Sequence, residues 1–149
     1  MTARQLATAA LIGGLAAVAR PAAGQGAGTG ATLATAVEQV RAAWLAHDAA
    51  RVVGPAAAIV LQIPGTDASA PLGRAQAVEV LRRYLRAAVE RGVVVRAVRD
   101  EAPGRGRAYA ELERRYVVAG TSDERRETVF LGFEPGAGGW RLAEVRIAP

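Results

Sequence analysis

The stretch Ala58–Arg91, AIVLQIPGTDASAPLGRAQAVEVLRRYLRAAVER, decides the fold of this chain. Its apolar run Ile59–Ile63 predicts a short strand buried on both faces, which the pair Pro64-Gly65 ends. An amphipathic helix follows, because apolar side chains recur at spacings of three and four residues, up to a C-cap at Gly92. The apolar stripe of this helix consists of Val78, Leu81, Tyr84, Leu85, Ala88 and Val89. We expect the helix to cover a sheet built from the residues that follow it.

The segment Leu33–Val53 predicts a second helical region with a break in it. Its expected buried side consists of Val37, Val40, Trp44, Leu45 and Val52. The dipeptide His47-Asp48 indicates a bend, with Asp48 capping a second short helical turn. Gly54 and Pro55 then end the helical region.

Four strands are expected after the long helix, over residues 93–99, 107–118, 127–134 and 140–147. In the second of these, the even-numbered positions are mostly apolar and the odd-numbered positions mostly charged. This alternation is typical of an antiparallel sheet with one face in water. The sequence therefore predicts an α+β domain over residues 33–149.

The first 24 residues have the features of a secretory signal. Arg4 supplies a positive start, residues 6–18 are an apolar run too short to span a bilayer, and small residues precede Gln25. The alternative is an uncleaved anchor, because Arg20 is a poor neighbour for a cleavage site. We expect an exported, periplasmic or secreted protein with no stable membrane anchor after cleavage, and a flexible lead-in over residues 25–32.

Composition excludes several function classes. All 19 basic residues of the 149 are Arg, the net charge is +5, and these Arg residues are scattered among acids. Nucleic-acid binding would need clustered Arg with interleaved aromatics, so we expect no nucleic-acid partner. Cysteine is absent and His47 is the one histidine, which excludes thiol catalysis and metal sites built from Cys or several His. We expect no metal and no cofactor.

The order of the expected elements, and three local segments, resemble the nuclear transport factor 2-like superfamily. These segments are WLAHD at residues 44–48, IVLQIPG followed by GRAQAVEVLRRYL, and the ending GGWRLAEVRI. More narrowly, the IPG loop and the AQA helix start resemble a small group of exported bacterial members of unknown function. The resemblance covers nearly all of residues 33–149. It implies N-terminal helices and one long helix packed on a curved antiparallel sheet, which form a cone with a pocket.

The catalytic residues of the resembled family have no counterpart in this chain. Steroid isomerase-like members use a Tyr on the first helix, an Asp before the first-strand Pro and a second Asp late in the sheet. The matching positions here are Val40, Ile63 and Phe130, which can neither give nor take a proton. We therefore expect no catalytic residues, and an exported small-molecule-binding or protein-interaction module. The alternative is an isomerase, dehydratase or cyclase that uses relocated groups.

Candidate ligand-binding residues are Trp44, Gln62, Tyr84, Arg114 and Tyr116. For a relocated active site the best candidates are Tyr84, Tyr116, Glu111 and Arg114. Tyr84 is either plain core or a side chain that reaches a polar partner. Arg114 either binds a ligand carboxylate inside the cone or extends to the pocket rim. Glu111 and Glu113 are either paired catalytic carboxylates or part of a solvent-facing ladder with Arg. The expected ligand is small and apolar.

A homodimer through the sheet is also expected. One face of the sheet carries an apolar band if the strand parity is right, and such a band is rarely left exposed on a monomer. The band consists of Tyr109, Val117, Val129, Leu131 and Phe133. The competing interpretation makes this band the inner wall of the pocket, because parity can slip by one residue.

Overall fold

The computed structural model describes residues 31–100 and 106–149. The helices are α1 (Leu33–Leu45), α2 (Ala49–Val53) and α3 (Arg74–Arg86). The strands are β1 (Ala58–Gln62), β2 (Leu72–Gly73), β3 (Ala88–Asp100), β4 (Ala108–Val118), β5 (Glu124–Gly136) and β6 (Gly139–Ala148). No helix in these two described ranges is long and apolar enough to cross a bilayer. The predicted signal, residues 1–24, lies outside the described residues.

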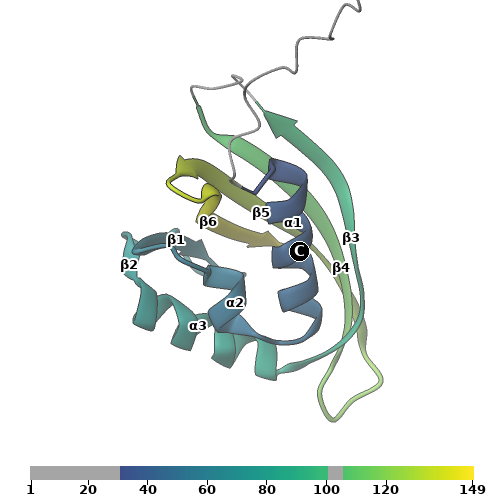
Figure 1. Ribbon diagram of the computed structural model, residues 1–149. Coiled ribbons are helices and arrows are strands. Elements are labelled where there is room, and N and C mark those ends of the chain that lie inside the picture. Colours follow the sequence, from purple (N-terminus) through teal and green to yellow (C-terminus); the bar gives the residue numbers. More distant parts are fainter. Residues whose placement is uncertain (1–30, 101–105) are drawn as a thin grey trace, which may run out of the picture.

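The strands form one curved six-stranded sheet in the order β2-β1-β6-β5-β4-β3. Strands β3 to β6 are an antiparallel meander, and β1 joins β6 in parallel. Figure 1 shows β3 and β4 curving around α1, with α2 beside α1 and α3 running below β1 and β2 in that view. The predicted α+β architecture is confirmed. The two-residue strand β2 was not predicted, and β1 is buried on one face only, because Val60 and Gln62 are half-buried.

One apolar core lies between the helices and the inner face of the sheet. Trp44 and Leu81 are fully buried in it, as predicted, together with Leu85. Each such side chain contributes roughly 1.5–3 kcal/mol by leaving water. Leu45 was predicted to be buried and is exposed. Leu45 is the last residue of α1, next to the fully buried Trp44.

The predicted break between the first two helices is confirmed. His47 has a φ of 54°, in the left-handed region, and it separates α1 from α2. The Asp48 carboxylate then accepts a hydrogen bond from the backbone N–H of Arg51, Oδ1 to N 3.0 Å, as an N-cap.

The long helix is shorter than predicted. It ends at Arg86, and Ala88 already pairs with Val118 as the first residue of β3. The chain gains ladder hydrogen bonds from this point on, and a β-branched run follows that suits a strand. Gly92 lies at a β-bulge and caps no helix. Glu90 therefore belongs to the sheet and not to the helix.

The predicted apolar band for dimerisation mixes the two faces of the sheet. Val129, Leu131 and Phe133 are buried in the core and form the inner wall, as the competing interpretation held. Val129 lies opposite Leu112 on β4, and both side chains point to the apolar inner face. Tyr109, by contrast, lies on the outer face. The length of the polar turn before β5 could not be fixed from sequence, so the faces of β5 could not be inferred from those of β4. The prediction that all five residues share one outer face is therefore wrong.

Candidate functional site

Four of the five predicted ligand-binding side chains meet inside the fold. Trp44 comes from the end of α1, Tyr84 from the last turn of α3, and Arg114 and Tyr116 from the inner face of β4. The guanidinium carbon of Arg114 lies 5.6, 5.1 and 4.1 Å from the ring centroids of Trp44, Tyr84 and Tyr116. At these distances the cation is attracted to the electron-rich ring faces. An aromatic cage therefore surrounds Arg114.

Two carboxylates complete this cage. Arg114 donates from Nε and Nη2 to the Glu90 carboxylate, at 3.0 Å and 2.6 Å to Oε1, and from Nη1 to Glu127 Oε2 at 2.9 Å. The side chains are 1%, 5% and 8% exposed for Arg114, Glu90 and Glu127, respectively. Charge-assisted bonds of this kind are strong, and burial limits their screening by water. Arg114 therefore neither reaches the rim nor offers an open guanidinium to a ligand.

Both tyrosine hydroxyls donate to the second carboxylate. Tyr84 donates to Glu127 Oε2, and Tyr116 donates to Oε1 at 2.8 Å. Burial raises the pKa of Tyr84 well above its usual range, and the hydrogen bond to Glu127 adds to this. The same two causes, in the same order, raise the pKa of Tyr116. The phenols thus stay protonated as donors, and Tyr84 has the polar partner that was one of its two predicted roles.

The sheet register explains why these groups meet. Glu90 on β3 lies opposite Tyr116, and Glu127 on β5 lies opposite Arg114, all on the inner face. Although burial lowers it, the hydrogen bonds to Glu90 raise the pKa of the Arg114 guanidinium above its usual value. Sequence reasoning missed both acids, because it assigned Glu90 to a helix surface and treated Glu127 as a strand end. The available signal was Arg114 itself, since a buried cation needs acids opposite it.

His47 extends the cluster to the surface. Its Nε2 lies 3.3 Å from Glu90 Oε1, and its ring is partly exposed. Because a carboxylate only accepts, this contact is a hydrogen bond when Nε2 carries a proton. The carboxylate of Asp48, the next residue, caps α2 and is not part of this contact.

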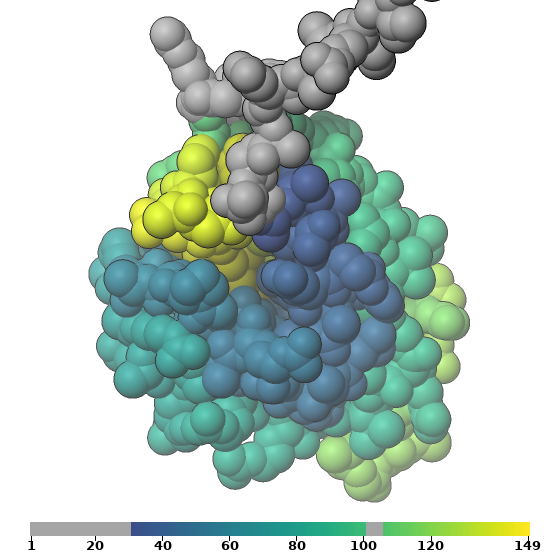
Figure 2. Space-filling view, viewed as in Figure 1, coloured from purple at the N-terminus to yellow at the C-terminus, as the bar shows by residue number. Residues whose placement is uncertain are grey.

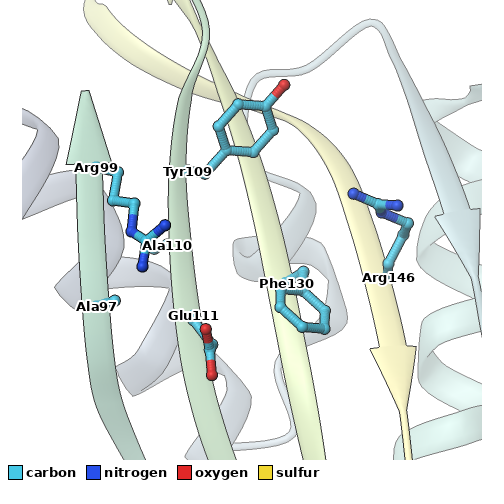
Figure 3. A pocket seen from close by; sticks show the side chains of 7 residues that line it. All are labelled: Ala97, Arg99, Tyr109, Ala110, Glu111, Phe130 and Arg146. Carbon is cyan, nitrogen blue, oxygen red and sulfur yellow. The ribbon is translucent and has the colours of Figure 1, made fainter. Parts of the chain in front are cut away.

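The remaining predicted residues lie on the opposite face of the sheet. Gln62 on β1 borders a hollow of about 200 Å³ beside Phe130 and Arg146. Glu111 borders a larger hollow of about 270 Å³ on the other side of Phe130. Figure 3 shows this larger hollow with the side chains of Glu111, Phe130 and Arg146 in front of the sheet and the helices behind it. Neither Gln62 nor Glu111 is part of the Arg114 cluster.

The two neighbouring acids of β4 have different surroundings. Glu113 accepts from Arg96 Nη2 at 2.8 Å, and this hydrogen bond lowers the pKa of the Glu113 carboxyl. The solvent-facing ladder was thus the right interpretation for Glu113. The Glu111 carboxylate has no hydrogen-bond or ion-pair partner among the described residues.

The cone retains a small hollow of its own. It measures about 50 Å³ and is lined by α1, α2, β5 and β6, with Val40, Val52 and Phe133 in its wall. Figure 2 shows a depression on this side of the molecule, between α1 and the yellow strand β6. The volume suits one or two water molecules. Deeper in the core, the buried Nε1 of Trp44 has no acceptor among the residues that the structure describes.

The described residues bring no three His, Asp or Glu side chains together in a way that could hold a metal ion. No family model and no curated protein matches the chain.

Solved structures do match. A Thiobacillus denitrificans protein provisionally described as a calcium/calmodulin-dependent protein kinase type II association domain is 19% identical, with a TM-score of 0.62 over 82% of this chain and 98% of its own. A provisionally described polyketide cyclase from Pseudomonas putida is 19% identical, with a TM-score of 0.59 over 80% and 92%. A ketosteroid isomerase-like protein from Erwinia carotovora is 18% identical, with a TM-score of 0.58 over 75% and 88%. These likenesses confirm the predicted cone, and their differing names show that one fold carries unlike functions.

Proposed function

We propose that this protein, which has the nuclear transport factor 2-like fold, is an exported, non-catalytic interaction module that pairs with a second copy through the outer face of its sheet.

The proposal rests on one observation: the polar side chains inside the cone already form hydrogen bonds and ion pairs with one another. Proton-transfer chemistry needs a base and an acid within hydrogen-bond reach of a substrate. Here Glu127 accepts from Arg114 and both tyrosines, while Glu90 accepts from Arg114 and contacts His47. The hollow inside the cone is lined by none of these side chains, and its volume of about 50 Å³ is far smaller than the 300–1,000 Å³ typical of ligand pockets. These contacts favour a stabilising role for the cluster over catalysis.

The outer face of the sheet offers a surface for a partner. Phe130 is 37% exposed at the middle of this face, and Val94 on β3 is also exposed. Charged side chains of both signs surround Phe130, including Glu111 and Arg146. An exposed aromatic side chain within a polar surround is typical of an interaction site.

Two substitutions on the same strand test this surface. Phe130→Glu should give a folded monomer, because the ring lies outside, whereas Phe133→Glu should unfold the domain, because that ring is 1% exposed in the core. Light scattering and circular dichroism of the mature protein at tens of micromolar report both results. A wild-type monomer at about 100 µM would overturn the pairing, and a Phe130→Glu dimer as stable as the wild type would move it to another surface.

A small ligand that is apolar apart from one hydrogen-bond acceptor is the second candidate. Trp44 supports it, because its buried Nε1 donor lacks an acceptor among the described residues. A ligand that accepts this hydrogen bond would have to displace core side chains. Native mass spectrometry of protein purified from its own host tests this, and a mass equal to that of the bare chain removes the candidate.

A further inference from the structure

One row of side chains crosses the outer face of the sheet. Ala97 on β3 lies opposite Glu111 on β4, and Glu111 lies opposite Phe130 on β5. Phe130 lies opposite Arg146 on β6, which pairs in turn with Gln62 on β1. The row therefore runs through five adjacent strands, and Phe130 is its middle member (Figure 3).

The charges in this row are arranged symmetrically about Phe130. Glu111 and Arg146 are each one strand away, on opposite sides, which places both backbones about 4.8 Å from that of Phe130. Glu111 has no ionic partner among the described residues. The Nε of Arg146 forms an ion pair with Glu144, at 3.0 Å to Oε1, and the Arg146 side chain is 50% exposed. An acid and a base with open bonding capacity thus flank one exposed ring.

We infer that the pair of copies is related by a two-fold axis that lies between the two facing sheets, over Phe130 and parallel to β5. This inference rests on the proposed pairing through the outer face. A rotation of 180° about that axis exchanges the two sides of the row, so Glu111 of each copy meets Arg146 of the other. The contact is self-complementary, as a two-fold interface must be, and it contains the ion pair twice. Charge complementarity thereby selects one register among the many in which two sheets could meet.

The shape of the surface agrees with this axis. Hollows of about 270 and 200 Å³ lie on the two sides of Phe130 and share its ring as a wall. They leave room for the partner's ring to lie beside Phe130, in the offset arrangement that aromatic pairs prefer. Small side chains, Ala97 and Ala148, border these hollows on the far sides.

The other carboxylates next to the row each already have a guanidinium contact within their own chain. Glu113 pairs with Arg96 at 2.8 Å, and Glu144 pairs with Arg146. The two-fold axis places Glu113 of each copy opposite Ala148 of the other, and Glu144 opposite Tyr109, so neither acid faces an acid of the partner. Glu111 is then the acid of this part of the face that gains most from a cation of the partner.

Charge reversal in a cycle tests the axis. Glu111→Arg and Arg146→Glu should each weaken dimerisation at least about tenfold in Kd, because each places like charges together twice per dimer. The double variant restores opposite signs and should return to within a few fold of the wild type. Sedimentation equilibrium measures Kd, and circular dichroism confirms that each variant is folded.

Arg99→Glu is the matched control, because Arg99 lies on the same face but opposite Tyr109, in the next row. Combined with Glu111→Arg, it should not restore dimerisation. A wild-type dimer in which the Glu111/Arg146 double variant binds no tighter than the single variants overturns the axis and leaves the pairing intact. A wild-type monomer overturns the pairing itself, so the two failures are distinguishable.

Discussion

Replacing Arg114 by methionine should destabilise the domain more than any exposed charge substitution. Methionine keeps much of the buried volume but removes the one cation of the cage. Glu90 and Glu127 would remain 5% and 8% exposed without a guanidinium between them. Removing one partner of a buried ion pair costs about 3–5 kcal/mol, since it leaves uncompensated charge in the core. We expect a loss of this size in the free energy of unfolding.

Two companion variants separate charge from packing. Arg96→Met breaks an exposed pair of similar length, 2.8 Å to Glu113, and should cost below about 1 kcal/mol. Arg114→Met combined with Glu90→Gln and Glu127→Gln removes all three charges and should recover most of the loss, because no uncompensated charge is then left in the core.

Urea unfolding followed by circular dichroism gives these free energies by linear extrapolation. A loss for Arg114→Met as small as that for Arg96→Met would refute the reasoning. So would a triple variant that is no more stable than the single one. If Arg114→Met does not fold at all, recovery in the triple variant still decides the outcome.

Three further predictions follow from the sequence and the fold. Leu81→Ala should cost about 2–5 kcal/mol in urea unfolding, because the side chain is fully buried, whereas Leu45→Ala at an exposed position should cost below about 1 kcal/mol. The raised pKa values of Tyr84 and Tyr116 mean that the folded state holds their protons longer than the unfolded state; stability should therefore be full below about pH 10 and fall as pH rises above it, more steeply in the wild type than in Tyr84→Phe. N-terminal sequencing of the exported protein should find a start near residue 25, and a start at residue 1 or 2 would contradict the leader.

Local periodicity determined most of the elements. The stripe around Leu81 and Leu85 identified α3, and Asp48 identified the break before α2, because helix spacing and capping involve residues within one or two turns. Alternation along β4 correctly placed Arg114 on the inner face and Tyr109 on the outer face. Such signals need no knowledge of what lies across the sheet.

The partners of these residues were decided only by tertiary structure. Glu90 is an ion-pair partner of Arg114 because sheet pairing begins at Ala88, although the apolar pattern of the predicted helix continues to Val89. Phe133 and Phe130 could not be assigned to their faces, because a one-residue change in register exchanges them. The Arg114 cage, and the outer row centred on Phe130, both depend on strands far apart in sequence meeting in one register. Register follows from the packing of the whole sheet, so a single chain segment cannot encode it alone.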